Sequence, residues 1–426
     1  MPQYTPPLRD MQFVLHELLG AVDELKMCPK HADIDADTIN AVLEEAGKFA
    51  SEVIAPINSS GDAEGCVLDK TTHEVRTPKG FKQAYAQYVE GGWPSLSCDP
   101  DYGGQGADHS FTVVLAEELG RADCAGVPMG IAVQAAMATP ALARFGSHEL
   151  KKQYLEPALT GEMVCSVAVS EPDAGSDVAG IRTRARRDGD DWVIDGRKMW
   201  ITNGTQADWL CLLARTSDEG GYMGMSMIIV PTDSPGFSVG RRIKKMGNHS
   251  SDTGELVLDG VRVPVSNTVG EIGRGFQQQM AQFQDERLIG AYMAYAGARR
   301  AIDRTIDYLR VREAFGKPLL ANQHLKYRLA ELIAEVDMLK EYCHAAAERV
   351  VAGEDATRMA TIAKLKAGRL AREVADAAVQ FHGGMGYAAE NWVERYYRDV
   401  RLISIGGGAD EVMLRIIALL EGMDRR

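Results

Sequence analysis

The period of the hydrophobic pattern changes twice along this chain of 426 residues, and this change restricts its fold more than any other feature. Apolar residues recur at helical spacing from Ile39 to Ile54, and the same rhythm returns at 81–89, 110–119 and 131–144. Near Glu162 it gives way to short apolar runs separated by turns, at 192–196, 210–214, 226–231 and 255–259. After Gly275 long helical patterns return, at 277–312, 322–352, 356–382 and 407–422.

This order predicts an α+β protein with three parts. A chain of this length exceeds one small core, so two or three domains are expected. We expect an N-terminal helical domain at 1–160, a middle β domain at 161–275 and a C-terminal four-helix bundle at 276–426. Pro and Gly predict loops at 55–58 and 99–106.

Composition narrows the partners and the compartment. A net charge of −13 argues against nucleic acid or an anionic membrane as a general partner. The seven cysteines are odd in number and form no C-x-x-C pair, so neither a zinc site nor a disulfide framework is expected. The start of the chain has no signal-peptide pattern, and no apolar window reaches membrane-spanning length. We therefore expect a cytosolic location.

The segment from Ser170 to Gly204 suggests the chemistry. Its first part, 170–177, is a turn of small residues whose backbone N–H groups suit phosphates. Its second part carries Trp200 two residues before Thr202, and an indole beside a hydroxyl suits a flat heteroaromatic ring. Together the two parts predict a flavin site, against the alternative of an ordinary turn beside a core tryptophan.

These two motifs closely resemble those of the acyl-CoA dehydrogenase family, and the resemblance covers almost the whole chain. It implies the family's helical, β and helical domains, and FAD as the cofactor. Val169 and Ser170 would then hydrogen-bond the flavin ring, and Ser176 would lie near the FAD pyrophosphate or the pantetheine of CoA. Trp200 would stack on the flavin, and Thr202 would reach its polar edge. The first ~35 residues resemble an extension of some long bacterial members.

The motif at 311–318, Val-Arg-Glu-Ala-Phe-Gly-Lys-Pro, is a second match. In the family its arginine and phenylalanine, here Arg312 and Phe315, reach the FAD of a neighbouring subunit. The resemblance implies further cofactor contacts from Gln323, Gln380, Gly383, Gly384, Ala409 and Glu411. Each FAD site would then need two chains, so a homo-oligomer, expected as a tetramer, follows. The alternative is a helix end with a solvated arginine.

The catalytic base identifies the subgroup. The family's reaction removes a proton beside a thioester carbonyl and a hydride from the next carbon, which requires a carboxylate base and donors that polarise the carbonyl. Many members carry the base near the C-terminus, where this chain has Gly407. The long-chain and isovaleryl subgroup instead carries Glu-Arg-Leu on the first bundle helix, matching Glu286, Arg287 and Leu288 here.

The resemblance thus assigns the base to Glu286, and the thioester oxygen to the Gly407 N–H and a ribityl hydroxyl of FAD. Arg287 would support CoA or the active-site loop. Asp285 and Glu411 are weaker candidates for the base, and Glu286 as a solvated helix residue is the alternative to a catalytic role.

The predicted function is α,β-dehydrogenation of an acyl-CoA, with electrons passed to an electron-transferring flavoprotein. The stretch 130–146 resembles citronellyl-CoA dehydrogenase-like members, which favours a medium, long or branched acyl chain. An oxidase of the same fold, usually longer, and a catalytically silent FAD-binding paralogue are the alternatives. No metal is expected. His249 stands where relatives often carry arginine, which leaves its role open.

Overall fold

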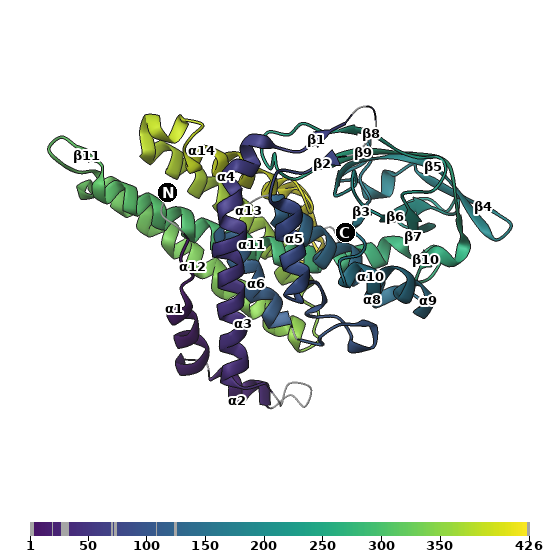
Figure 1. Cartoon of the computed structure of the whole chain (residues 1–426), viewed down its shortest axis with the longest axis horizontal. Coiled ribbons are helices and arrows are strands. Elements are labelled where there is room, and N and C mark those ends of the chain that lie inside the picture. The colour runs from purple at the N-terminus through teal and green to yellow at the C-terminus, as the bar shows by residue number, and fades with distance from the viewer. Residues whose placement is uncertain are drawn as a thin grey trace.

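The computed structural model describes residues 4–18, 20–26, 34–69, 71, 75–107, 109–122 and 126–423. Helices from both ends of the chain lie beside a sheet that the middle of the chain forms (Figure 1). The predicted α+β class and the order of a helical, a β and a helical part are confirmed.

The N-terminal helices enclose a core that includes Phe49, Phe81 and Tyr88. The loop predicted at 55–58 is wrong, because α3 continues through a π-helical segment, Phe49–Ile54, directly into α4. Pro56 follows the π-helical segment directly, and such an irregular turn allows a helix to continue past a residue without a backbone N–H. The elements are α1 Leu8–Gln12, α2 Ala21–Lys26, α3 Ala36–Lys48, α4 Ala55–Glu64, β1 Val67–Leu68, β2 Val75–Arg76, α5 Phe81–Glu90, α6 His109–Ala122, α7 Gly126–Val133, α8 Thr139–Phe145, α9 His148–Leu150 and α10 Glu156–Leu159.

The middle part forms a sheet with strand order β10-β7-β6-β4-β5-β9-β8, in which β3 also pairs with β6. Its strands are β3 Cys165–Ala168, β4 Arg184–Asp188, β5 Asp191–Thr202, β6 Trp209–Arg215, β7 Met225–Pro231, β8 Phe237–Arg242, β9 Thr253–Pro264 and β10 Thr268–Val269. In β6, Cys211 and Leu213 pack toward one core, whereas Leu210 and Leu212 pack toward another. Burial on both faces explains why this strand is a continuous apolar run without alternation.

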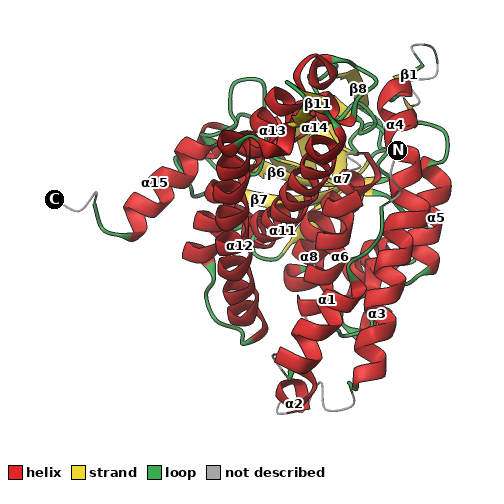
Figure 2. Cartoon of the chain, turned by 90° about the vertical axis from the view of Figure 1, so that its left-hand side faces the viewer, coloured by secondary structure: helices red, strands yellow, loops and turns green. Residues whose placement is uncertain are grey.

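The C-terminal part contains three long helices, α11 Gly275–Val311, α12 Gln323–Val351 and α13 Thr357–His382, followed by α14 Trp392–Val400 and α15 Asp410–Leu420. A hairpin of β11 Glu313–Ala314 and β12 Lys317–Pro318 joins α11 to α12 and protrudes at one end of the molecule (Figure 1). Helix α15 projects from the side of the bundle (Figure 2). It begins at Asp410, later than the predicted 407, because Gly407 and Gly408 have φ angles of +64° and +100°.

Helix α6 of the N-terminal part packs closely on α11. A Cβ added at Gly120 would lie 2.4 Å from the carbonyl oxygen of Met293, so only glycine permits this approach. The contact fixes the position of α11, the helix that carries the predicted base Glu286.

Three general properties hold within the described ranges of the chain. No helix there combines the length and the hydropathy needed to cross a membrane. The five described cysteines, Cys66, Cys98, Cys165, Cys211 and Cys343, carry free thiols. No cluster of three or more histidine, cysteine or carboxylate side chains among the same residues has a metal-binding arrangement.

Candidate active site

Glu286 on α11 lies against Gly407, in the loop that precedes α15. A Cβ at Gly407 would be 3.0 Å from Oε1 of Glu286, so the missing side chain leaves the space that the carboxylate borders. The structure therefore brings together the two residues that the sequence assigns to the base and to the thioester-binding N–H.

Two cations flank this carboxylate. Arg287 is 4% exposed, and its Nε donates a hydrogen bond to the carbonyl of Gly407 at 3.4 Å. Lys364 on α13 is equally buried, and its ammonium donates to the carbonyl of Gly408. Sequence reasoning did not single out Lys364. The available signal was a lysine within the alanine-rich buried face of a helical pattern, between Ala360 and Ala367.

Burial raises the pKa of Glu286 to about 7, against the lowering effect of the charges on Arg287 and Lys364. Burial also lowers the pKa of Lys364 to about 8, against the opposing charge of Asp410 in particular. A carboxylate whose pKa lies near neutral pH is matched to general acid–base work at that pH. The site can therefore take up or release one proton beside the backbone of Gly407.

The other candidate carboxylates have different surroundings. Asp285 precedes Glu286 by one residue and pairs with Arg144 of α8, at 3.1 Å from Oδ2 to Nη2. Ala409 is the N-cap residue of α15, and Glu411 is exposed in the first turn of that helix. Asp285 is thus paired with an arginine and Glu411 is open to solvent, whereas Glu286 faces Gly407.

The turn predicted to bind the flavin is held by a buried ion pair. Lys198 of β5 is fully buried, and its Nζ lies 2.9 Å from both Glu171 Oε1 and the carbonyl of Val169. The Glu171 carboxylate also accepts hydrogen bonds from the backbone N–H groups of Arg182 and Thr183. Burial lowers the pKa of Lys198 to about 8, against the charge of Glu171. Both residues lie within or beside the predicted motifs, but sequence reasoning did not assign them.

This ion pair places the loop next to strand β5. The carbonyl of Ser170 accepts a hydrogen bond from the Met199 N–H at 2.9 Å, and the carbonyl of Thr202 accepts one from Ser166 Oγ at 2.5 Å. Ser176 is exposed at the far side of the turn. Val169 and Ser170 thus lie beside Lys198 and Met199, and Thr202 lies farther along β5, beside Ser166.

Trp200 is an exception to the pattern of its strand. Its side chain is 57% exposed, whereas that of the neighbouring Ile201 is 3% exposed. Its φ angle of +66° is unusual for a residue with a side chain, and the pairing of β5 with β9 is irregular between Lys198 and Ile201. The strand therefore presents a large aromatic plane to the outside at a local backbone distortion, which suits a flat ring as its cover.

The second group of predicted cofactor residues lies elsewhere on the same chain. Arg312 and Phe315 belong to the protruding hairpin, and the Phe315 side chain is fully exposed with φ +54°. Figure 1 separates this hairpin from the β domain by the length of the bundle. Within one chain the structure does not bring Arg312 or Phe315 to Trp200.

The remaining predicted residues lie in or next to a groove on the helical bundle. Gln380 lines a groove of about 690 Å³ together with Arg328, Arg372, Phe381, Tyr397 and Arg401. Gln323 precedes His324, which also lines this groove. Gly383, with φ +60°, and Gly384 are exposed and have open space where a side chain would stand. A ligand or a second chain can therefore approach the backbone of this turn closely.

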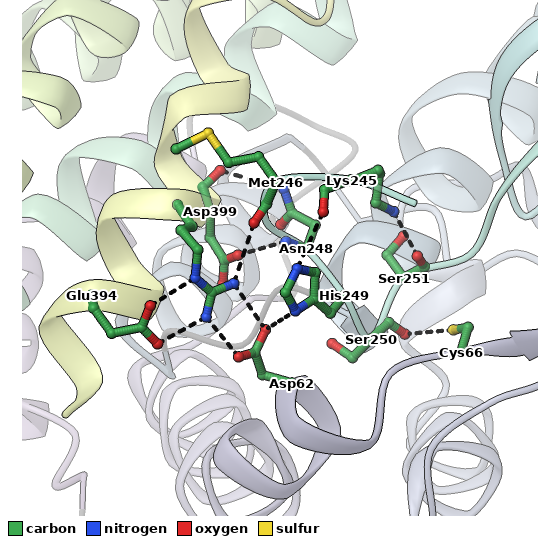
Figure 3. Close-up of polar contacts among 11 residues, drawn as sticks. Asp62, Cys66, Lys245, Met246, Asn248, His249, Ser250, Ser251, Glu394 and Asp399 are labelled. Atoms are coloured by element: carbon green, nitrogen blue, oxygen red, sulfur yellow. Dashed lines mark hydrogen bonds and ion pairs between the residues drawn. The ribbon is translucent and has the colours of Figure 1, made fainter. Parts of the chain in front are cut away.

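His249 belongs to a polar network that joins all three parts of the chain (Figure 3). Its Nδ1 lies 3.3 Å from Oδ1 of Asp62 on α4, and Arg398 of α14 binds the other oxygen of Asp62 at 2.8 Å. Arg398 also binds Glu394 at 2.8 Å. A position where relatives often carry arginine thus contributes to an interdomain contact.

The same network holds the start of the segment that leads to Gly407. The N–H of Asn248 donates to Oδ1 of Asp399 at 2.5 Å, and a Cβ at Gly247 would lie 2.5 Å from the carbonyl oxygen of Arg398 (Figure 3). The middle domain is therefore packed tightly against the end of α14, a few residues before the active-site loop.

The three-part fold, with a buried carboxylate facing a glycine loop, is that of a flavoprotein dehydrogenase class, and comparison with known families agrees. Models of the N-terminal, middle and C-terminal domains of acyl-CoA dehydrogenases match residues 36–162, 166–261 and 273–419. The chain therefore belongs to the acyl-CoA dehydrogenase family, an oxidoreductase family that acts on CH–CH groups.

Individual relatives have similar lengths. The chain is 34% identical to "Probable acyl-CoA dehydrogenase YngJ" of Bacillus subtilis, over 88% of this chain and 96% of the relative. It is 33% identical to the 3-(aryl)acrylate reductase of Clostridium sporogenes, over 88% and 95%. The structure of butyryl-CoA dehydrogenase from Megasphaera elsdenii superposes with a TM-score of 0.82 at 31% identity, covering 89% of this chain and 97% of that one.

Proposed function

We propose that this protein is an FAD-dependent dehydrogenase that converts a medium-chain, long-chain or branched acyl-CoA into the trans-2-enoyl-CoA. It would belong to the subgroup that carries its base on the first bundle helix. The observation that carries this proposal is the Glu286 carboxylate, which borders the open space at Gly407.

The proposed chemistry assigns each part to a residue. Glu286 takes the proton from the α-carbon, and the electron pair of that C–H bond forms the new double bond as hydride leaves the β-carbon. The Gly407 N–H donates to the thioester oxygen and stabilises the negative charge that develops there. Arg287 binds the carbonyl of Gly407, which belongs to the following peptide, and so restrains the loop that carries the N–H. FAD, when bound, supplies the hydride acceptor.

The residues at the end of the sheet fit that cofactor. The exposed indole of Trp200 offers a surface for stacking, and Thr202 and Ser170 lie on adjacent backbone that Lys198 and Glu171 hold in place. Ser176 and the open turn around it suit a phosphate or the pantetheine chain.

A second copy of the chain would complete the site. Arg312 and Phe315 are exposed on the hairpin, far from Trp200 of the same chain, and an arginine fork suits a pyrophosphate. The same neighbouring chain would also contact the cofactor through Gln323, Gln380, Gly383 and Gly384. Further cofactor contacts would come from Ala409 and Glu411 at the start of α15. We infer a homo-oligomer, a tetramer, which passes its electrons to an electron-transferring flavoprotein.

Replacement of the base tests the function. Glu286→Gln keeps the shape of the side chain but cannot take the proton, so we expect anaerobic reduction of bound FAD by acyl-CoA to slow by about 10² to 10⁴-fold. Asp285→Asn, one residue away and paired with Arg144, is the matched control and should slow it by less than about tenfold. Full-speed reduction in Glu286→Gln would refute the assignment, and a panel of straight and branched acyl-CoAs run in parallel identifies the substrate.

A second candidate function is the reverse reaction, reduction of the α,β double bond, because one relative is named 3-(aryl)acrylate reductase. A Glu286 with a pKa of about 7 can donate as well as accept a proton near neutral pH. Stopped-flow mixing of reduced protein with an enoyl-CoA, compared with oxidised protein and the acyl-CoA, distinguishes the two directions. Oxygen consumption without another acceptor would instead indicate an oxidase.

A further inference from the structure

Lys364 approaches the candidate active site from a different helix than Glu286 does. The point where a Cβ of Gly407 would stand is 3.0 Å from Glu286 Oε1 and 3.9 Å from Lys364 Cε. The ammonium of Lys364 donates to the carbonyl of Gly408, the next residue of the loop. Carboxylate and lysine thus flank the same glycine, one from α11 and the other from α13.

The charges around these two groups come from three helices. Glu286 faces Arg287 on its own helix and Lys364 on α13. Lys364 faces Glu286 and Arg287 on α11 and the carboxylates of Asp410 and Glu411 on α15.

The two α15 carboxylates interact with other cations or with solvent as well as with Lys364. Asp410 pairs with Arg372 at 3.1 Å and lies 3.7 Å from Arg369, and Glu411 is exposed to solvent. Solvent screens an exposed charge much more than a buried one. Asp410 is itself buried, but its charge is shared between these two arginines, so Glu286 is the remaining partly buried carboxylate that faces the lysine.

A buried ammonium costs free energy unless an anion or several acceptors compensate it. One carbonyl oxygen satisfies one of its three donors. The remaining compensation has to come from nearby carboxylates, and the same attraction favours the charged form of the carboxylate in return.

Resting on the function proposed above, we propose that Lys364 is a positioning residue for the base: its buried charge stabilises the carboxylate form of Glu286, while its hydrogen bond fixes the turn that carries Gly407. Lys364 touches neither substrate nor cofactor in this role. It acts through Glu286 and through the backbone of the loop.

The test compares charge with shape at position 364. Lys364→Gln removes the charge but keeps a hydrogen-bond donor, Lys364→Met removes both, and Lys364→Arg keeps both. The pH dependence of anaerobic FAD reduction by acyl-CoA at low substrate concentration reports the ionisation of the free base. We expect the midpoint to move upward by about one pH unit in the Gln and Met variants, which lack the charge, and to stay near the wild-type value in the Arg variant.

The size of the rate effect then depends on pH. Well below the midpoint the Gln variant should be about tenfold slower than the wild type, and at high pH it should come within about threefold of it. A merely structural role would lower the rate by the same factor at every pH and leave the midpoint unchanged, which would overturn the proposal. An unshifted midpoint in both the Gln and Met variants would overturn it as well.

A second readout does not depend on turnover. Thermal unfolding as a function of pH, measured for Lys364→Gln in the wild-type and in the Glu286→Gln background, reports the same charge interaction. Below pH 7, where Lys364 itself stays protonated, the change in pH dependence caused by Lys364→Gln should disappear once Glu286 is neutral. If it persists, Lys364 interacts with a different group and the inference is wrong. Full activity of Glu286→Gln alone would instead refute the proposed function and leave this interaction to be judged by the melting data.

Discussion

At the scale of single residues, Glu286 is kept in surroundings that oppose its working form. Burial favours the neutral carboxylic acid, whereas the proton abstraction proposed for Glu286 requires the anion. Arg287 and Lys364 offset part of this cost. The charged form of Glu286 therefore lowers the free energy of unfolding of the protein.

The pH dependence of unfolding should reveal that cost. The pKa of Glu286 is raised from 4.5 to about 7 in the folded state, so below pH 4.5 both states hold the proton. Between these values the unfolded chain releases the proton first, and stability falls as pH rises. Above pH 7 the penalty is complete, up to about 3 kcal/mol.

Glu286→Gln carries no such penalty. Its melting temperature should match that of the wild type near pH 4.5 and exceed it by a few degrees at pH 8, measured by scanning calorimetry at equal FAD content. Asp285→Asn serves as the neighbouring control. Equal melting curves of Glu286→Gln and the wild type at both pH values would mean that Glu286 is not buried as described.

At the scale of elements, the β11–β12 hairpin has little packing within its own chain. Phe315 is fully exposed at its tip, and both Phe315 and Gly316 have positive φ angles. A hairpin of two short strands is only marginally stable alone. Its conformation is better explained by a contact outside the chain, which is the role proposed for it.

Variants of the hairpin should therefore affect assembly and cofactor together. We expect Arg312→Ala and Phe315→Ser to lower FAD content and to shift the oligomer toward smaller species, with helical circular dichroism unchanged. Sedimentation velocity and the ratio of flavin to protein absorbance measure both effects. Arg310→Ala is the control, because Arg310 is exposed two residues earlier and pairs with Asp307 on its own helix. A Phe315→Ser protein with full flavin and an unchanged oligomer would contradict the two-chain site.

The arrangement of the helices and strands also explains which features could be predicted from the sequence and which could not. The three-part fold was predictable because the hydrophobic period changes sharply. Glu286 and Gly407 could be proposed as a pair because each lies in a segment that resembles a family motif, and the structure places them together. Lys364 and the Lys198–Glu171 pair were not found, because their partners lie on other segments and periodicity carries no information about such pairing. The prediction of a loop at 55–58 is wrong because the π-helical segment before Pro56 lets the helix continue past the proline, and residue composition does not reveal such a segment.

At the scale of the whole molecule, Arg398 forms an ion pair that links the C-terminal part of the chain to the N-terminal part. Its guanidinium binds Asp62 of the N-terminal part and Glu394 of its own helix, and the pKa of Arg398 is raised chiefly by its hydrogen bonds to Glu394. Its removal leaves two carboxylates facing each other across the junction (Figure 3).

Arg398→Met should therefore destabilise the protein by about 2 kcal/mol, less than a fully buried pair because the site is partly hydrated. Thermal unfolding measures this as a melting temperature lower by a few degrees. Arg299→Met is the comparison, since Arg299 pairs with Asp303 on an exposed helix face and its loss should change little. Asp62→Asn combined with Arg398→Met should recover part of the loss, and an Arg398→Met protein as stable as the Arg299 variant would show that the junction holds without this network.

The space at Gly407 has a consequence for how a chain of this kind can change by mutation. A glutamate introduced there would meet Glu286 Oε1 at 3.0 Å from its Cβ, and its backbone would stay at φ +64°, which side chains disfavour. Gain of the second carboxylate is therefore penalised while Glu286 is present, and loss of Glu286 removes the proposed base while Gly407 is still glycine. Each single step is harmful and only the pair restores a base. A carboxylate at 286 and a carboxylate at 407 are therefore alternatives that no single neutral substitution connects. A lineage that moves from one to the other passes through an ancestor with no base or with two crowded carboxylates.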